Sequence, residues 1–139
     1  MAQSLRKRRE AVIRRHVEAE SRGDVDGVVA SFSHPKYEMV PLGTEHDGEA
    51  AVRLLLSSLF LAFPDFKLVV RNLYHSDKAV IAEVWMDGTH RAPWAGVEAK
   101  GHRIHLPVVG IFLFEGDKLL CEKVYFDSAT LLRQITIGK

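Results

Sequence analysis

The sequence has a single cysteine, no excess of either charge, and no apolar run long enough for a bilayer. Cys121 has no second cysteine with which to form a disulfide or a cysteine-based zinc site, which agrees with a reducing cytosol. Nineteen Lys and Arg residues oppose eighteen Asp and Glu residues, so the net charge of +1 lacks the basic excess of a nucleic-acid-binding protein. The longest apolar run, 54–63, contains Ser57 and Ser58 and is too short to cross a membrane. We therefore expect a cytoplasmic protein that binds neither nucleic acid nor membrane.

Several familiar motifs are also missing. The basic residues at 6–9 are not followed by the apolar segment of a secretory signal, because Arg14, Arg15 and Glu18 interrupt it. The chain has no GxSxG nucleophile elbow, no phosphate-binding P-loop and no dinucleotide fingerprint. It also lacks HExxH or a comparable spacing of metal ligands. We expect no metal site.

The sequence does contain enough apolar material for one folded domain. Its 139 residues are 47% hydrophobic and 27% charged, which excludes a disordered chain. No internal repeat or linker divides it, so a single domain over 1–139 is predicted.

Apolar residues recur at helical spacing in the first half of the chain. This pattern predicts one helix over 5–20, a second between Asp24 and Pro35, and a third from an acidic cap at 47–49 to Pro64. Because apolar residues cover more than one face of the third helix, we expect it to be buried between layers.

From Phe66 onwards the apolar residues alternate as they do in strands. Strands are predicted over 67–74, 79–86, 103–114 and 119–126, with a short final helix over 128–135. Helices followed by a run of antiparallel strands are typical of an α+β fold with helices on one face of a curved sheet. Bent against its helices, such a sheet would form a cone with a pocket at its open end.

Asp127 is the first candidate for chemistry, because it follows the apolar and aromatic end of the last predicted strand. A carboxyl group held in a partly apolar pocket can have a raised pKa and act as a general acid or base. Asp127 also begins the segment Asp-Ser-Ala-Thr, where it could simply cap the final helix and have a lowered pKa. Residue order alone leaves both interpretations open.

Histidines form the second group of candidates, since imidazole titrates near physiological pH. His90 lies at the end of a predicted strand, and His16 lies on the apolar stripe of the first helix, where hydrogen-bonded core histidines are common. His102 and His105 are three residues apart on a strand and point to opposite faces, so one metal ion cannot easily bind both.

Short motifs occur in a fixed order along nearly the whole chain: Gly23-Asp24-Val25-Asp26, Phe63-Pro64-Asp65-Phe66, Gly88-Thr89-His90, Gly101-His102-Arg103, Glu115-Gly116-Asp117-Lys118, Tyr125-Phe126-Asp127 and Leu131-Leu132-Arg133-Gln134. In this order the chain resembles the SnoaL-like polyketide cyclase family of the nuclear-transport-factor-2-like superfamily. The resemblance implies a curved antiparallel sheet wrapped into a cystatin-like cone, closed by three helices from the N-terminal half, and a homodimer.

The same resemblance implies ring closure by intramolecular aldol condensation of a polyketide ester, without cofactor or metal. In the cyclases an acid–base carboxylate lies on the last strand, and Asp127 matches that position. His90 matches a Gly-Thr-His element that lines the pocket in the family.

Two other activities of the superfamily are disfavoured by the residues present. The base of ketosteroid isomerase, just before a proline of the first strand, would fall at Val40, and His16 stands where that enzyme has a tyrosine. The Arg-x-Asp of limonene-epoxide hydrolase would fall at 83–85, where the sequence reads Glu-Val-Trp.

The sequence therefore supports two functions. The first is an acid–base enzyme acting on a small apolar carbonyl compound, with Asp127 removing a proton and His90 or His105 donating to the oxyanion. Strand parity, aromatic content and the family position of His16 suggest the residues that contact the substrate: Tyr125, Trp85, Trp94, Phe63, Met39 and His16. The second is a non-catalytic module that binds a hydrophobic ligand or dimerises, since no second acid–base residue matches. Apolar residues on both faces of 108–114 predict a homodimer through the sheet.

Overall fold

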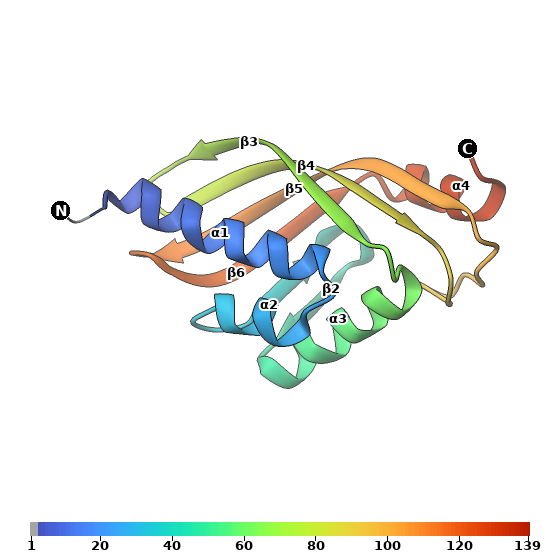
Figure 1. Cartoon of the computed structure of the whole chain (residues 1–139), viewed down its shortest axis with the longest axis horizontal. Helices are drawn as coiled ribbons and strands as arrows, with labels where there is room; N and C mark the ends of the chain where they lie inside the picture. The colour runs from blue at the N-terminus through green and yellow to red at the C-terminus, as the bar shows by residue number, and fades with distance from the viewer. Residues whose placement is uncertain (1–2) are drawn as a thin grey trace.

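Six strands form one curved sheet in the computed structural model, which describes residues 3–139 (Figure 1). Their order across the sheet is β2-β1-β6-β5-β4-β3, and the strands are β1 (Lys36–Met39), β2 (Thr44–Asp47), β3 (Lys67–His75), β4 (Ala79–Thr89), β5 (Arg103–Glu115) and β6 (Lys118–Phe126). All neighbours are antiparallel except β1 and β6, which run parallel because a long crossover and no hairpin connects them. The predicted α+β fold is confirmed, with this one parallel pair as a correction.

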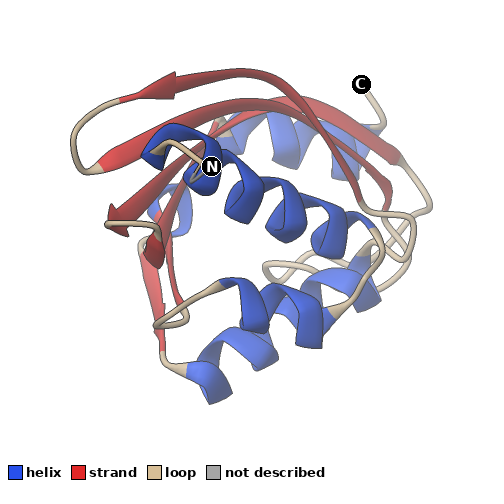
Figure 2. Cartoon of the chain, turned by 60° about the vertical axis from the view of Figure 1, so that its left-hand side comes forward, coloured by secondary structure: helices blue, strands red, loops and turns tan. Residues whose placement is uncertain are grey.

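The helices cover the concave side and one end of the sheet. Figure 2 shows the sheet arching over α1 (Leu5–Ser21), with α2 (Val25–Ser31) and α3 (Glu49–Ala62) on the same side. The final helix, α4 (Ser128–Ile137), packs against β5, and the 3-10 turn η1 (Val40–Leu42) follows β1. The outermost strands β2 and β3 do not pair with each other, so the sheet curves without closing.

Side-chain caps fix where most of the helices begin. Ser4, Asp24 and Asp127 each accept a backbone N–H at the start of α1, α2 and α4. The acidic cap predicted for α3 is wrong, because Gly48 occupies that position without a side-chain bond. The Oδ1 atom of Asp47 instead lies 2.6 Å from Nε2 of His34.

Only one face of α3 is buried, so the prediction that it lies between layers is wrong. Val52, Leu55 and Leu56 pack into the core, whereas Leu54 and Leu61 are 71% and 68% exposed. No further element of the described chain covers these two side chains, and this side of α3 therefore faces solvent.

Strands β4 and β5 alternate between core and surface, as their sequence pattern predicted. On β5, Ile104, Leu106 and Val108 are buried, and the residues between them face outward. Gly116, with φ of 59°, makes the tight turn that joins β5 to β6. Among the described residues, no helix combines the length and the hydropathy that a membrane span requires.

Candidate active site

A cavity of about 70 Å³ lies between the concave face of the sheet and the helices. Its wall is largely apolar and includes Leu55, Phe63 and Phe112. Glu20, Tyr37 and Glu122 are polar residues that also line this cavity. Charged groups are costly in such surroundings unless they are paired, so their partners decide what the cavity can do.

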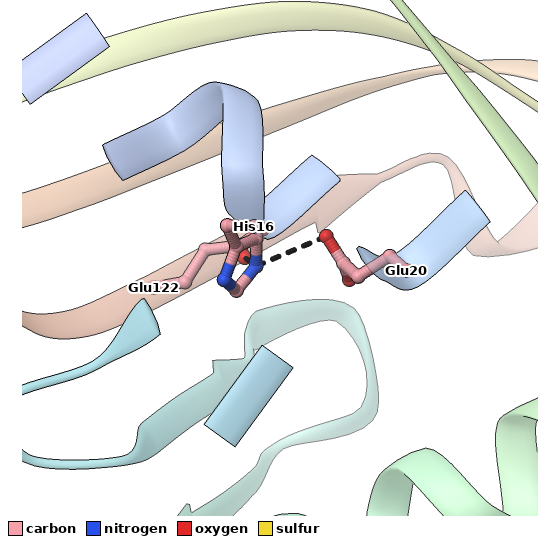
Figure 3. A group of neighbouring side chains, drawn as sticks. All are labelled: His16, Glu20 and Glu122. Carbon is pink, nitrogen blue, oxygen red and sulfur yellow. Dashed lines mark hydrogen bonds and ion pairs between the residues drawn. The ribbon is translucent and has the colours of Figure 1, made fainter. Parts of the chain in front are cut away.

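Three elements bring these polar groups together, and Figure 3 shows His16, Glu20 and Glu122 side by side. His16 and Glu20 are one helical turn apart on the buried face of α1. Glu122 points inward from β6, with the same parity as the cavity residue Val124. Tyr37 on β1 is in direct register with Glu122 across the parallel pair.

The hydrogen bonds of His16 define where its protons lie. The hydroxyl of Ser31 donates to the backbone oxygen of Val28 at 2.5 Å, so it must accept from Nδ1–H of His16, 2.8 Å away. The other nitrogen, Nε2, lies 2.8 Å from Oε1 of Glu122, and this short contact requires a proton between the two atoms. The ring is thus held from behind, and one shared proton connects it to the carboxyl group.

Glu20 is buried but incompletely bonded. Its Oε2 accepts from the Tyr37 hydroxyl at 3.3 Å. Its Oε1 lies 3.0 Å from Nε2 of His16, yet it receives no hydrogen bond, because that N–H points to Glu122. Buried polar atoms of folded proteins are nearly always hydrogen-bonded, so this oxygen differs from ordinary core polar groups.

Burial and mutual charge shift the titration of the whole cluster. Burial raises the pKa of Glu122 and the charge of Glu20 adds to this, so that the pKa reaches about 7 although the bond to His16 opposes the change. Burial lowers the pKa of His16, but the two carboxylates outweigh it and raise the value to about 10. Burial, followed by the charge of Glu20, raises the pKa of Tyr37 well above 10, so this hydroxyl remains a hydrogen-bond donor. Near neutral pH the group that gains or loses a proton is therefore Glu122.

A glycine leaves the space that the Glu122 carboxyl group occupies. A Cβ atom on Gly110 of β5 would lie 3.0 Å from Oε2 of Glu122 and 3.1 Å from the ring of Phe112. Both distances are shorter than ordinary van der Waals contact, so a larger residue would push the carboxyl group from its place.

The atoms Nε2 of His16, Oε1 of Glu20 and Oε1 of Glu122 lie within 4.8 Å of one another. A cation would find three ligands here, and in the structure the hydrogen bond between His16 and Glu122 already joins two of them. Together the three side chains form a buried acid–base cluster at the wall of an apolar cavity.

Of the residues predicted to contact a substrate, Trp94, Phe63 and Met39 do line the cavity. His16 lies directly behind the two carboxyl groups that line it. His90 is buried and stacked on Phe63, with ring centroids 5.2 Å apart, but it is not among the cavity-lining residues. Burial lowers the pKa of His90, which keeps its ring neutral.

The expectation that Asp127 faces the cavity is wrong. Its side chain is exposed at the start of α4, where it accepts bonds from the Ala129 amide at 3.1 Å and the Thr130 hydroxyl at 2.7 Å. The Thr130 hydroxyl and then the Ala129 amide hold the pKa of Asp127 below its ordinary value. The sequence had left capping open as an alternative, and the geometry agrees with capping.

Three further residues point to the outer, convex side of the sheet. This corrects the predicted places of Tyr125 and Trp85 on the pocket wall and the predicted role of His105 as a donor to the oxyanion. Tyr125 is 41% exposed. Trp85 stacks on His105 with ring centroids 4.3 Å apart, and His105 is 2.6 Å from Asp87, all on this outer face. The inward positions of β4 are those of the opposite parity, such as Val84.

Glu20, Glu122 and Tyr37 were not identified from the sequence. Glu20 follows His16 by four residues on the apolar stripe of α1, and this spacing was a usable signal. Glu122 shares its parity with Val124, and this parity is opposite to that of Tyr125 and Asp127, the residues that the sequence places at the pocket.

The sequence was compared with models of known protein families. The family model described as SnoaL-like polyketide cyclase matches residues 10–135. No curated protein sequence matches the chain.

Solved structures of similar shape have low sequence identity to the chain. A candidate SnoaL-like polyketide cyclase from Jannaschia sp. CCS1 is 17% identical with a TM-score of 0.85, and the match covers 98% of this chain and 97% of that one. A protein with a ketosteroid-isomerase-like fold from Catenulispora acidiphila is 13% identical with a TM-score of 0.75, covering 89% and 91%. An epoxide hydrolase/cyclase-like enzyme of pyran ring formation in the polyether salinomycin is 18% identical with a TM-score of 0.75, covering 90% and 95%. At these identities the likeness concerns the fold.

Proposed function

The chain belongs to the SnoaL-like polyketide cyclase family, and from that premise we propose that it is an acid–base enzyme in which Glu122 removes a proton beside a carbonyl group of an apolar small molecule. The observation that carries this proposal is a carboxyl group with a pKa of about 7 on the wall of an apolar cavity. A general base is most effective when its pKa lies near the working pH.

The proposed reaction is an aldol ring closure within one substrate molecule. Glu122 takes a proton from the carbon next to a carbonyl group, and the resulting enolate carbon forms a bond to a second carbonyl carbon. The alkoxide left on that carbonyl takes the proton back from Glu122, so the enzyme returns to its starting state. No proton or electron is gained or lost overall.

The other polar residues have supporting roles in this proposal. The Tyr37 hydroxyl, whose bond to Glu20 is a long 3.3 Å, donates to the oxyanion as it forms. His16 is a positioning residue, because it holds the Glu122 carboxyl group at 2.8 Å from behind. Glu20 keeps the pKa of Glu122 raised through its negative charge.

Exchange of carbon-bound hydrogen for deuterium tests the first step without knowledge of the natural substrate. A series of methyl ketones is incubated with the protein in D2O, and uptake of deuterium beside the carbonyl is followed by NMR. Glu122→Gln is expected to lower the exchange rate by at least about 100-fold, because it removes the base while keeping the shape. Glu115→Gln, at the exposed end of β5, is the matched control and should exchange at the wild-type rate.

Unchanged exchange in a folded Glu122→Gln variant would overturn the proposal. Wild-type protein that binds the ketones but never exchanges them would favour the non-catalytic binding module instead. Both proteins are checked by circular dichroism so that loss of fold is not mistaken for loss of the base.

We also propose that two copies associate through the convex face of the sheet. Val109, Ile111 and Leu113 form an outward, partly exposed apolar row on β5, and Tyr125 lies beside it on β6. Ile111→Glu is expected to give monomers in light scattering, whereas Leu54→Glu on the far side of α3 should leave the mass unchanged. A wild-type monomer at micromolar concentration would contradict this interface.

A further inference from the structure

A second hollow adjoins the cavity and opens at the surface. It measures about 390 Å³ and lies between η1, the turn at 94–97 and α4. Its wall is built mainly from apolar side chains, which include Leu42, Val97, Ala129 and Leu132. None of its lining residues among those described carries a charge, so this outer groove suits an uncharged, apolar group.

The outer groove and the inner cavity have three lining residues in common. Trp94, Phe126 and Leu131 belong to both walls and thus form the partition between the two spaces. Trp94 and Leu131 are only 8% and 6% exposed, so a ligand that extends from the groove into the cavity must displace these side chains.

The backbone around Trp94 is built to hold this side chain in place. Trp94 and Val97 exchange two backbone hydrogen bonds, of 3.0 and 2.9 Å, across the two-residue turn Ala95-Gly96. Ala95 has φ of 50°, a left-handed conformation that costs a residue with a side chain roughly 1 kcal/mol. Such strain is retained where the surrounding structure requires the conformation, and here the turn presents Trp94 to the partition.

The inner cavity by itself is small for a substrate. Its volume of about 70 Å³ lies far below the roughly 300–1,000 Å³ of ordinary ligand pockets. It has room for a reacting carbonyl group beside Glu122 but not for the body of a larger molecule.

We infer that the outer groove is the distal subsite for an uncharged apolar tail of the substrate, which passes between Trp94, Phe126 and Leu131 to place its carbonyl group at Glu122. This inference rests on the proposed function, since it takes Glu122 as the reacting end. It gives the substrate class as elongated carbonyl compounds with an apolar tail, in preference to compact ones.

Binding of methyl ketones of increasing chain length tests the inference independently of catalysis. Trp94 reports binding by fluorescence once Trp85→Phe has removed the other tryptophan, which lies on the outer face. Affinity is expected to rise by up to about fourfold for each added methylene group that enters the groove.

Leu132→Arg places a charge in the groove and should abolish this gain for long ketones while leaving short ones unaffected. Ala129→Glu, in the first turn of α4 where an acidic side chain suits the helix dipole, should have the same effect. Leu54→Arg, at a position on α3 that is also exposed, is the control and should retain the full dependence on length.

Length dependence that survives in both groove variants would overturn the inference, as would a wild-type protein with no length dependence or no binding. Glu122→Gln distinguishes this failure from failure of the proposed base. It should keep the dependence of affinity on chain length while losing proton exchange. Loss of exchange in Glu122→Gln, combined with no length dependence in the wild-type protein, would reject the groove and retain Glu122 as the base.

Discussion

Helix α1 carries two buried cationic side chains, Arg9 and His16, two turns apart on the same face. Arg9 donates to three backbone oxygens, those of Gly116, Ser76 and Asp77, at 2.7, 3.3 and 3.0 Å. Its charge is thus shared among carbonyl groups of the two hairpin turns, with no carboxylate among these acceptors.

The surroundings of His16 differ in kind. Its partners are the carboxyl groups of Glu20 and Glu122, both of which also line an apolar cavity, and one oxygen of Glu20 receives no hydrogen bond. In this cluster the pKa of His16 and the pKa of Glu122 are both raised, whereas an arginine side chain such as that of Arg9 does not deprotonate in proteins. Arg9 therefore fixes the fold, and the His16 cluster is available for proton transfer.

The largest effect that separates the two regions is expected for Arg9→Ala. The variant leaves three turn carbonyls without their donor and should lower the free energy of unfolding by about 3 to 4 kcal/mol, as measured by urea denaturation. The protein that remains folded should keep its proton exchange rate. The exposed neighbour Arg8→Ala, which loses one surface ion pair with Asp117, should change stability by less than about 1 kcal/mol. Equal losses of stability in Arg9→Ala and Arg8→Ala would contradict the structural role given to Arg9.

The second effect is a dependence of stability on pH that arises at the His16 cluster and not at Arg9. The pKa of Glu122 rises from 4.5 to about 7 on folding, so this contribution is complete below 4.5 and is lost as pH rises through about 7. Between about pH 5 and pH 8 the loss is about 2.5 kcal/mol. The pKa of His16 rises from 6.5 to about 10 on folding, so its contribution to stability is also lost as pH rises, here through about 10.

Glu122→Gln should flatten this slope in urea denaturation at a series of pH values, because the titrating carboxyl group is gone. Arg8→Ala serves as a charge-changing control that keeps the slope. A Glu122→Gln slope equal to that of the wild type would show that the pH dependence arises elsewhere.

A third effect is smaller and separates the two partners of Glu122. Glu20→Gln removes a negative charge that raises the pKa of Glu122, whereas His16→Gln removes the hydrogen bond that lowers it. The midpoint at which exchange activity increases with pH should move down for the first variant and up for the second, each by about one pH unit. Shifts in the same direction would mean that the variants act through general loss of structure.

The smallest effect is expected outside both regions, at Asp127. Asp127→Ala removes the cap of α4 and should cost about 1 kcal/mol of stability, while Asp127→Asn, which caps equally well, should cost little. Exchange activity should be unchanged in both variants. A large loss of activity in Asp127→Asn would restore this residue to the catalytic hypothesis.

Some of the site residues could be predicted from the sequence and others could not. The apolar stripe of α1 predicted that His16 is buried, and apolar and aromatic content identified Trp94, Phe63 and Met39 for the cavity. Glu122 was missed because an inward carboxylate breaks the alternation by which inward positions are recognised. Strand alternation alone does not say which of the two faces of a sheet is the inner one, and Asp127 follows the face that points outward.

The sequence by itself determined the four α-helices, the four long strands β3 to β6, their order and the α+β class, because helical and strand periodicities are local properties of the chain. The short strands β1 and β2 were not among the predicted elements. It also supplied both interpretations of Asp127 without choosing between them. Only the tertiary structure brought Glu20 of α1, Tyr37 of β1 and Glu122 of β6 to one cavity wall. The physical reason is that the pKa of a buried acid depends on neighbours more than one hundred positions away, such as His16 for Glu122, 106 residues apart. Those neighbours meet only when the sheet curves over the first helix.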